Sequence, residues 1–191
     1  MTFRRFRRHL NGHRPALKVP LPAADPDAAW RALGLVVDWI RHADAKAAAV
    51  LAASGVAGGV LYNLVKDRGE PSVALNIAAG VSGVLIFVSA ALAAFALRPR
   101  MWSKEKPTSK IYYAHIARGY GKPEGGGAYS DAMLELASDG VEMTREISSQ
   151  IWANAHVAHV KFVLVNIAMN TFLLCLPFLA ALPIIIFFGW E

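Results

Sequence analysis

The chain has 191 residues, of which 55% are hydrophobic, and it carries a formal net charge of +6 and a single cysteine. This length leaves room for one domain, and the hydrophobic content is high for a soluble protein, which must cover its core with polar surface. The lone Cys175 excludes both a disulfide and a thiolate metal site within one chain.

Residues 1–25 are predicted to form a disordered basic arm and a linker. Met1–Leu10 has the charge of a signal-peptide n-region, but no apolar h-region follows it. Pro15, Pro20 and Pro22 without helical periodicity indicate an extended linker. Anionic lipid headgroups attract basic residues that lie close to a membrane. We therefore expect the excess of Lys and Arg to contact the lipid bilayer, and we expect no nucleic-acid partner.

Three windows of the sequence contain no Asp, Glu, Lys or Arg. They are Ala47–Val65, Pro71–Leu97 and Phe162–Trp190, of 19, 27 and 29 residues. A helix needs about 20 apolar residues to cross the hydrocarbon layer. The alternative is a set of buried helices in a soluble core, but a chain this short supplies too little protein to surround them. We therefore predict an all-α, integral membrane helical bundle with three transmembrane helices.

The first helix is predicted to begin well before the first window. Asp25 and Pro26 form a plausible N-cap and first-turn pair, and apolar residues then recur at spacings of three and four without a breaker. One helix is therefore expected over 26–65, with its first half in the cytoplasm and the rest forming the first crossing. The second crossing is expected over 71–97.

The segment 98–129 is polar and rich in glycine and proline, which predicts a cytoplasmic loop region with a short helix at about 109–118. Ser130 is a reasonable start for the next helix. Nothing breaks the helical pattern before Pro177, so one cytoplasmic helix is expected over 130–161, running straight into the third crossing over 162–188.

The distribution of basic residues predicts the orientation. Of the 20 Lys and Arg residues, nine precede Ala47, nine lie in 98–161 and two lie between the first two windows. Positive charge is retained on the cytoplasmic side, so the N-terminus is expected in the cytoplasm of a bacterial cell, with the helices in the inner membrane.

The helices that extend beyond the membrane carry polar residues close to it. Continuing their heptads places Asp44 on one seam and Asn154 and Lys161 on the other, with Gln150 in the companion row and Lys46 beside them. We expect these five side chains to form one cluster. Such a cluster is either a satisfied structural network or a small-ligand pocket.

The loop region adds aromatic residues among basic ones. Such faces can stack a nucleobase beside a bound phosphate, but tyrosines near headgroups are also ordinary interfacial anchors. The residues concerned are Tyr112, Tyr113, His115, Tyr120, Lys110, Arg118 and Lys122.

Two further patterns concern metals and packing. His156 and His159 lie three residues apart on a predicted helix, and His42 is a third candidate ligand, but no carboxylate or thiolate has a fitting spacing, so no metal site is expected. Asn166 and Asn170 lie one turn apart inside the third crossing, where amides usually mark an interhelical or oligomeric interface or wet a pore.

Small residues four apart, at Gly55 and Gly59 and at Ser54 and Gly58, favour close helix packing within or between chains. We expect a homo-oligomer. No nucleophile triad, phosphate-binding loop or acid pair is present in the sequence, which predicts a protein that is not an enzyme and needs no cofactor.

The stretch Trp39–Gly55, WIRHADAKAAAVLAASG, resembles the opening motif of the Pycsar transmembrane effectors, the PycTM family. In that motif an aromatic residue precedes an A-D-x-K-A core that runs into a transmembrane helix. The likeness covers about 28–188 and includes an aromatic pair followed by isoleucine, at Tyr112, Tyr113 and Ile116. The family often has phenylalanines at this pair and an acidic residue in place of His115, and a related opening occurs in small SLATT-type membrane proteins.

The resemblance implies an antiphage effector that senses a cyclic pyrimidine nucleotide, cCMP or cUMP, made by a partner cyclase, and then impairs the membrane. On this basis Lys46 and Lys161 are expected to contact the phosphate and Tyr113 to stack. The ribose and base are expected to contact Asp44, Gln150 and Asn154. The competing hypotheses are a constitutive small channel or transporter subunit and a membrane adaptor protein.

Overall fold

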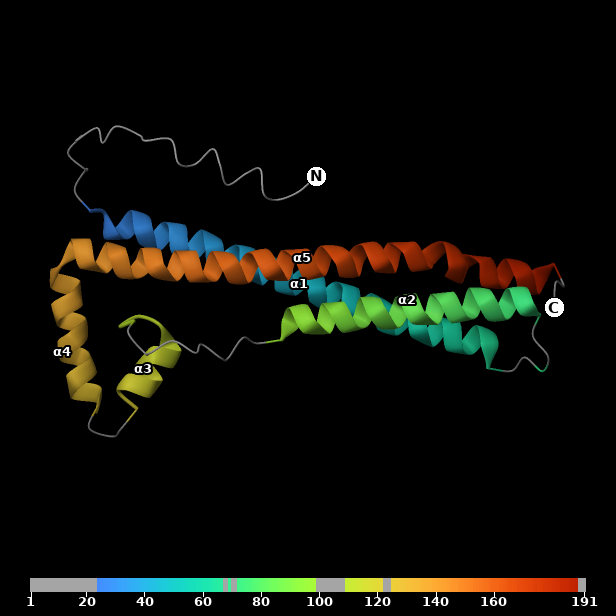
Figure 1. The fold of residues 1–191 in the computed structure, drawn as a ribbon, viewed down its shortest axis with the longest axis horizontal. Helices are drawn as coiled ribbons and strands as arrows, with labels where there is room; N and C mark the ends of the chain where they lie inside the picture. The colour runs from blue at the N-terminus through green and yellow to red at the C-terminus, as the bar shows by residue number, and fades with distance from the viewer. Residues whose placement is uncertain (1–23, 67–68, 70–71, 99–108, 122–124, 189–191) are drawn as a thin grey trace, which may run out of the picture.

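The computed structural model describes residues 24–66, 69, 72–98, 109–121 and 125–188. Within these ranges the chain forms helices and no strand, so the all-α prediction is confirmed. Three long helices lie together as an elongated bundle, and two short ones lie beside one end of it (Figure 1). The helices are α1 (Pro26–Val65), α2 (Val73–Leu97), α3 (Tyr113–Gly119), α4 (Gly125–Ser138) and α5 (Gly140–Phe187).

Several predicted segments fall outside the described residues. They are the arm and linker up to residue 23, most of the turn between the first two windows, and residues 99–108 and 122–124 of the polar loop region. The fold is therefore described from α1 onward.

Helix α1 has the bounds that its sequence pattern predicts. The Asp25 side chain accepts a hydrogen bond from the Ala28 N–H at 3.0 Å, and Pro26 occupies the first helical position. Both features stabilise a helix start, because the first N–H groups have no partner within the helix. The 40 residues of α1 span about 60 Å, roughly twice the thickness of the hydrocarbon layer.

Helices α1, α2 and α5 are each long and apolar enough to cross a membrane, which confirms the three predicted spans by length and composition. In Figure 1, α1 and α5 run in the same direction and α2 runs in the opposite direction beside them. Helix α2 begins at Val73, two residues later than predicted, because Ser72 caps it by accepting from the Leu75 N–H at 3.3 Å.

The core of the three-helix part consists of layers, and all but the last have one buried residue from each helix. One end layer contains Ala47, Ala96 and Val165, and the next contains Val50, Ala93 and Ala168. Such small side chains let the helix backbones approach closely. Further layers follow at Ala57, Ile86 and Cys175 and at Leu75, Ala78 and Leu182.

A buried polar link joins the three helices in the middle of this core. The Ser89 hydroxyl donates to the Ala168 carbonyl at 2.9 Å, and the Ser54 hydroxyl lies 3.4 Å from Ser89 Oγ. All three residues are buried. The small-residue pattern is divided between faces: Gly58 packs against α2, whereas a Cβ added at Gly55 would meet nothing within 4 Å.

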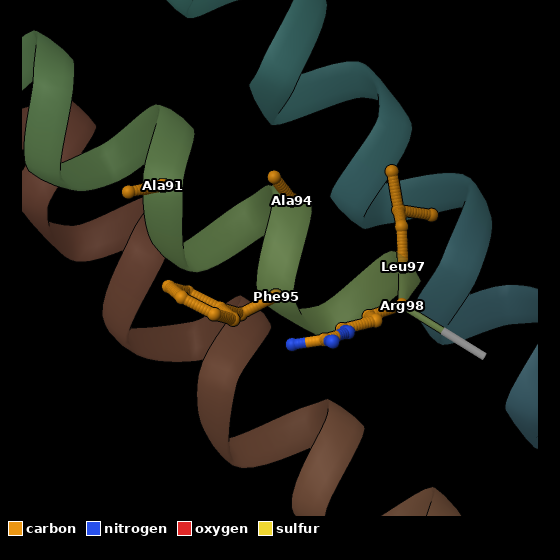
Figure 2. Close-up of a pocket in the computed structure, with 5 residues that line it drawn as sticks. All are labelled: Ala91, Ala94, Phe95, Leu97 and Arg98. Carbon is orange, nitrogen blue, oxygen red and sulfur yellow. The ribbon is translucent and has the colours of Figure 1, made fainter. Parts of the chain in front are cut away.

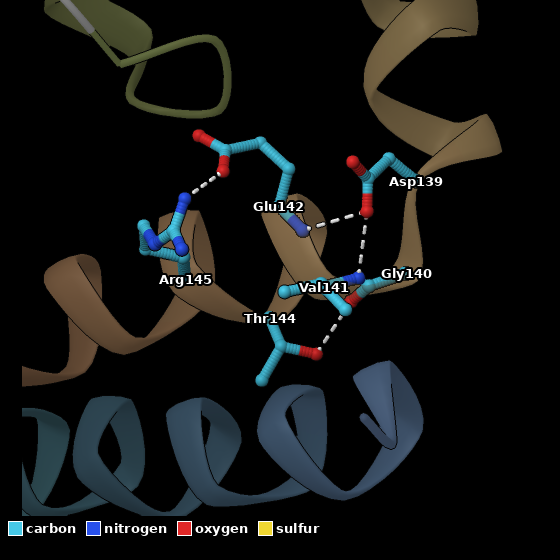
Figure 3. A network of polar contacts seen from close by, with 6 residues as sticks. All are labelled: Asp139, Gly140, Val141, Glu142, Thr144 and Arg145. Atoms are coloured by element: carbon cyan, nitrogen blue, oxygen red, sulfur yellow. Dashed lines mark hydrogen bonds and ion pairs between the residues drawn. The ribbon is translucent and has the colours of Figure 1, made fainter. Parts of the chain in front are cut away.

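The prediction of one uninterrupted helix over 130–161 is wrong, because the chain breaks at Asp139. Helix α4 ends at Ser138 and meets the start of α5 at a steep angle (Figure 1). Asp139 has an extended backbone, and its carboxylate accepts from the N–H groups of Val141 and Glu142 at 2.9 and 3.0 Å (Figure 3). An aspartate that caps a helix N-terminus and is followed by glycine starts a new helix more favourably than it continues the old one.

The short helices also differ from the prediction. Helix α3 begins at Tyr113, four residues later than expected, because Ser109 uses its polar groups in contacts with other segments. Helix α4 begins at Gly125, inside the predicted loop. Its glycine-rich first turn is held by tertiary contacts, since Tyr129 packs against Tyr120 and donates to the Lys110 carbonyl at 3.2 Å.

Helix α5 continues through Pro177 and Pro183 to Phe187. Each proline removes one backbone donor, but helices within a membrane tolerate proline because neighbouring groups satisfy the carbonyl that it leaves. We use the name stalk for the parts of α1 and α5 that extend beyond the three-helix core, namely 26–46 and 140–161. An apolar cluster outside the three-helix core joins the stalk residues Met143 and Ile147 to Leu136 of α4.

Candidate functional site

An ion pair joins α1 and α5 where the stalk meets the three-helix core. Lys161 Nζ donates to Asp44 Oδ1, and the Lys161 side chain is only 14% exposed. Ala43 and Ala47, on either side of Asp44 along α1, are fully buried and bring the two helices together here. The predicted meeting of Asp44 and Lys161 is therefore confirmed.

Lys46 belongs to the same level of the stalk but faces outward. Its side chain is exposed, and Nζ lies 6.0 Å from the centroid of the Phe162 ring. This is the distance of a weak cation–π contact, which leaves the ammonium free to bind an anion. Two lysines thus lie near this level: Lys161 is paired with a carboxylate, and Lys46 contacts an aromatic ring.

The prediction of a single polar cluster is wrong, since Gln150 lies elsewhere. Its side-chain N–H donates to Ser109 Oγ at 3.1 Å, and that hydroxyl donates to Glu146 Oε2 at 2.9 Å. Gln150 precedes Lys161 by 11 residues, which is about 16 Å along the helix axis. Half-buried Asn154 lies between the two levels.

A second polar group therefore surrounds Ser109, and His115 belongs to it. The Ser109 N–H donates to His115 Nδ1 at 3.1 Å, and both residues are buried. A nitrogen that accepts carries no proton, so the neutral ring holds its proton on Nε2. That buried Nε2 has no hydrogen-bond partner among the residues that the structure describes.

The tyrosine pair lies at the edge of this second group. Tyr112 makes edge-on contacts with Tyr113 and His115, with ring centroids 4.9 Å apart in each case. Burial raises the pKa of the Tyr112 phenol and the Tyr113 hydroxyl adds to the rise, while Arg118 opposes it. Tyr113 is 64% exposed and could present its ring to a ligand.

The remaining predicted residues do not form a metal site within the described ranges, where no group of three potential ligands occurs. The His156 ring packs 4.5 Å from the Trp152 ring, and His42 and His159 are exposed. Asn166 and Asn170 are exposed on α5 and do not lie between helices of the same chain.

A shallow hollow of about 440 Å³ lies on α2, where that helix approaches the stalk (Figure 2). Its walls are almost entirely carbon, with one guanidinium at the edge, which suits a lipid chain better than a nucleotide. None of the predicted ligand residues lines it. The lining residues are Ala91, Ala94, Phe95, Leu97 and Arg98.

Sequence reasoning missed Ser109, Glu146 and the inward position of His115. Ser109 lies outside any helix, so no periodicity connects it to α5, and Glu146 resembles any exposed stalk residue. Only the tertiary contacts of the segment before α3 reveal this group.

Comparisons with known proteins agree with the motif at Trp39–Gly55. The model of the PycTM family, described as the Pycsar effector protein domain, matches residues 28–188. The chain is 33% identical over 165 residues to the Pycsar effector protein PtPycTM of Propioniciclava tarda. The aligned region covers 85% of this chain and 80% of that protein. No solved structure gives a significant match.

Proposed function

Since this chain belongs to the PycTM family of Pycsar effector proteins, we propose that it is a membrane effector of antiphage defence that responds to a cyclic pyrimidine nucleotide, cCMP or cUMP. A partner cyclase makes the nucleotide during infection, and the effector then impairs the bacterial inner membrane. The infected cell stops growing or dies, which is abortive infection. The membrane character of the chain rests on α1, α2 and α5.

The proposal places the stalk in the cytoplasm, where the nucleotide is made. The excess of Lys and Arg before Ala47 and in 98–161 supports this orientation, because basic residues are retained on the cytoplasmic side. Both ends of the ion pair, Asp44 and Lys161, are then reachable from the cytoplasm.

The observation that carries the proposal is the partly buried pair of Lys161 and Asp44. A nucleotide phosphate is an anion that competes with the Asp44 carboxylate for the Lys161 ammonium. Exposed Lys46 adds a second positive charge near this level. Binding would replace a contact between α1 and α5 by a contact with ligand, which alters how the two helices pack.

The two polar groups then account for a conformational response. Gln150 lies with the second group, about 16 Å from Lys161 along α5, and Tyr113 lies at the edge of that group. In our proposal Tyr113 stacks on the base, while Gln150, Asn154 and Asp44 contact the base and ribose. A ligand that engages both groups draws α3 toward Lys161, and this difference in affinity between two arrangements shifts their populations.

Replacing Lys46 by alanine tests the phosphate role. The protein is co-expressed with a pyrimidine cyclase, and membrane potential is followed with a voltage-sensitive dye. K46A is expected to abolish depolarisation while the protein remains in the membrane fraction. Lys66 is the matched control, because its Nζ also lies 6.0 Å from the centroid of an aromatic ring, that of Tyr62, but at the C-terminal end of α1. K66A should depolarise like the unchanged protein.

The same experiment separates the alternatives. Depolarisation without an active cyclase would favour a constitutive channel, for which the exposed Asn166 and Asn170 are the supporting observation. Unchanged potential at saturating cyclic nucleotide would contradict the effector mechanism and favour an adaptor. Response retained in K46A would remove Lys46 from the site without affecting the rest of the proposal.

A further inference from the structure

Helix α5 carries two stripes of seven-residue periodicity on opposite faces. The inner stripe faces α1 and α2 and contains the buried residues Ala158, Val165, Ala168, Cys175 and Leu182. The outer stripe has steps that alternate between four and three, and every member is exposed. Its members are Trp152, His156, His159, Val163, Asn166, Asn170 and Leu173.

The two asparagines of the outer stripe point away from the rest of the chain. Each lies two residues from fully buried Ala168, in opposite directions along α5. At about 100° per residue, both side chains lie roughly 160° around the helix from Ala168. They therefore project from the face opposite the bundle core, within the apolar part of α5.

Lipid is a poor neighbour for this face. A primary amide has two donors and an acceptor, and hydrocarbon satisfies none of them. The outward face of α2 shows what a lipid-facing surface of this protein looks like: Val84, Phe87 and Phe95 are all more than 60% exposed and wholly apolar. The amides of Asn166 and Asn170 would be satisfied by hydrogen bonds to another polypeptide at the same depth in the membrane.

We propose that the outer face of α5 packs against the same face of a second copy of this chain. Copies inserted with one orientation have parallel α5 helices related by a two-fold axis along the membrane normal. Each asparagine then meets its own equivalent at the same depth, and an amide both donates to and accepts from another amide. The surface is self-complementary without any further partner.

The length of the stripe also favours an identical helix. It runs for 22 residues from Trp152 to Leu173, about 33 Å, and so leaves the membrane and follows the stalk. At the stalk end Trp152 is 67% exposed, and its ring packs at a tilt against the His156 ring. A partner must match apolar, amide and aromatic zones in that order, which a parallel copy of α5 does in register. Polar seam residues of this kind fix the register of paired helices.

Cysteine cross-linking tests the proposal in native membranes without any nucleotide or cyclase, so its outcome is independent of the proposed function. The background is C175A, which removes the native thiol. L173C places a thiol on the outer stripe. V56C on α1 and F87C on α2 are matched controls, since these residues are also exposed and lie next to the core layer that contains Cys175. Copper phenanthroline is the oxidant.

A dimer cross-link is expected for L173C and for neither control. Adding N166L and N170L to L173C keeps the branched shape of the side chains but removes the amides, and should lower the cross-link yield about eightfold, as the loss of two average hydrogen bonds between membrane helices would. Substituting Asn76 of α2 by leucine in the same way should leave the yield unchanged.

Three results would overturn the proposal. The first is dimer formation through V56C or F87C with none through L173C, which would move the interface to another helix. The second is a cross-link from L173C only to a different protein. The third is rapid labelling of N166C and N170C by a charged, water-soluble thiol reagent, which would place these residues in a water-filled pore.

Discussion

Lys161 is the least exposed charged partner among the ion pairs of the described residues, at 14%. Removing one member of such a pair leaves a charge with little water around it. A double-mutant cycle with D44N and K161M is expected to give a coupling free energy of about 1–3 kcal/mol. The measurement is thermal unfolding of the protein in detergent.

The control cycle uses Asp38 and Arg41, whose side chains are 65% and 76% exposed and form an ion pair of 3.0 Å on the same helix. Exposed pairs of this kind contribute less than about 1 kcal/mol. Equal coupling in the two cycles would show that burial does not strengthen the Asp44–Lys161 contact.

Single residues show why the predicted cluster was only partly right. Parallel helices keep a constant offset, and the contact of Asp44 with Lys161 sets that offset at 117 positions. Gln150 then lies level with Leu33, in the apolar part of the stalk, and not with Asp44. Periodicity gives the face of a helix reliably, but height depends on the offset, which only a contact between helices supplies.

At the scale of the helices, the hydroxyl of Ser89 connects α2 to the backbone of α5. S89A is expected to destabilise the bundle by about 0.6 kcal/mol, and by no more than about 1.7 kcal/mol, which is the range for hydrogen bonds between membrane helices. Unfolding by a denaturing detergent measures the loss.

Ser82 is the matched control for this substitution. It is equally buried on α2, but its hydroxyl donates to the Ala78 carbonyl of its own helix at 2.8 Å. S82A removes no hydroxyl contact between helices and should change stability less than S89A. A larger effect of S82A would show that the Ser89 link does not join the helices energetically.

The elements differ in how well the sequence predicts them. Helices α1 and α2 were predicted to within two residues because length and hydropathy dominate there. The break at Asp139 was missed although Ser138, Asp139 and Gly140 form a recognisable turn sequence. The apolar stripe continues through this turn, since Leu136 and Met143 share one cluster on both sides of it. The spacing of apolar residues therefore does not reveal that the chain changes direction between α4 and α5.

At the scale of the whole molecule, the orientation in the membrane is the testable property. Alkaline phosphatase is active only outside the cytoplasm, so a fusion after Gly69 is expected to be active and a fusion after Ser138 inactive. A cytoplasmic reporter such as green fluorescent protein should give the reverse pattern. High phosphatase activity at Ser138 would invert the topology and place the stalk outside the cell.

The helical class and the three candidate membrane spans were predicted from composition, because an uncharged apolar helix of this length is unfavourable in water. The arrangement of α3 and α4 beside the stalk did not, since it depends on contacts such as that of Ser109 with Glu146. The sequence therefore predicts the membrane part of this molecule better than the part proposed to bind ligand.

Helix α2 ends at Leu97, level with Ala47 and Val165, while α1 and α5 continue past it. The bundle thus has three long helices in its core and two in the stalk. Stiffness against bending falls abruptly where α2 ends, and Asp44 and Lys161 lie just beyond this point. Beyond Leu97 the backbone amides of α1 and α5 are packed by one fewer long helix, so hydrogen exchange in α1 and α5 should show a sharp boundary there.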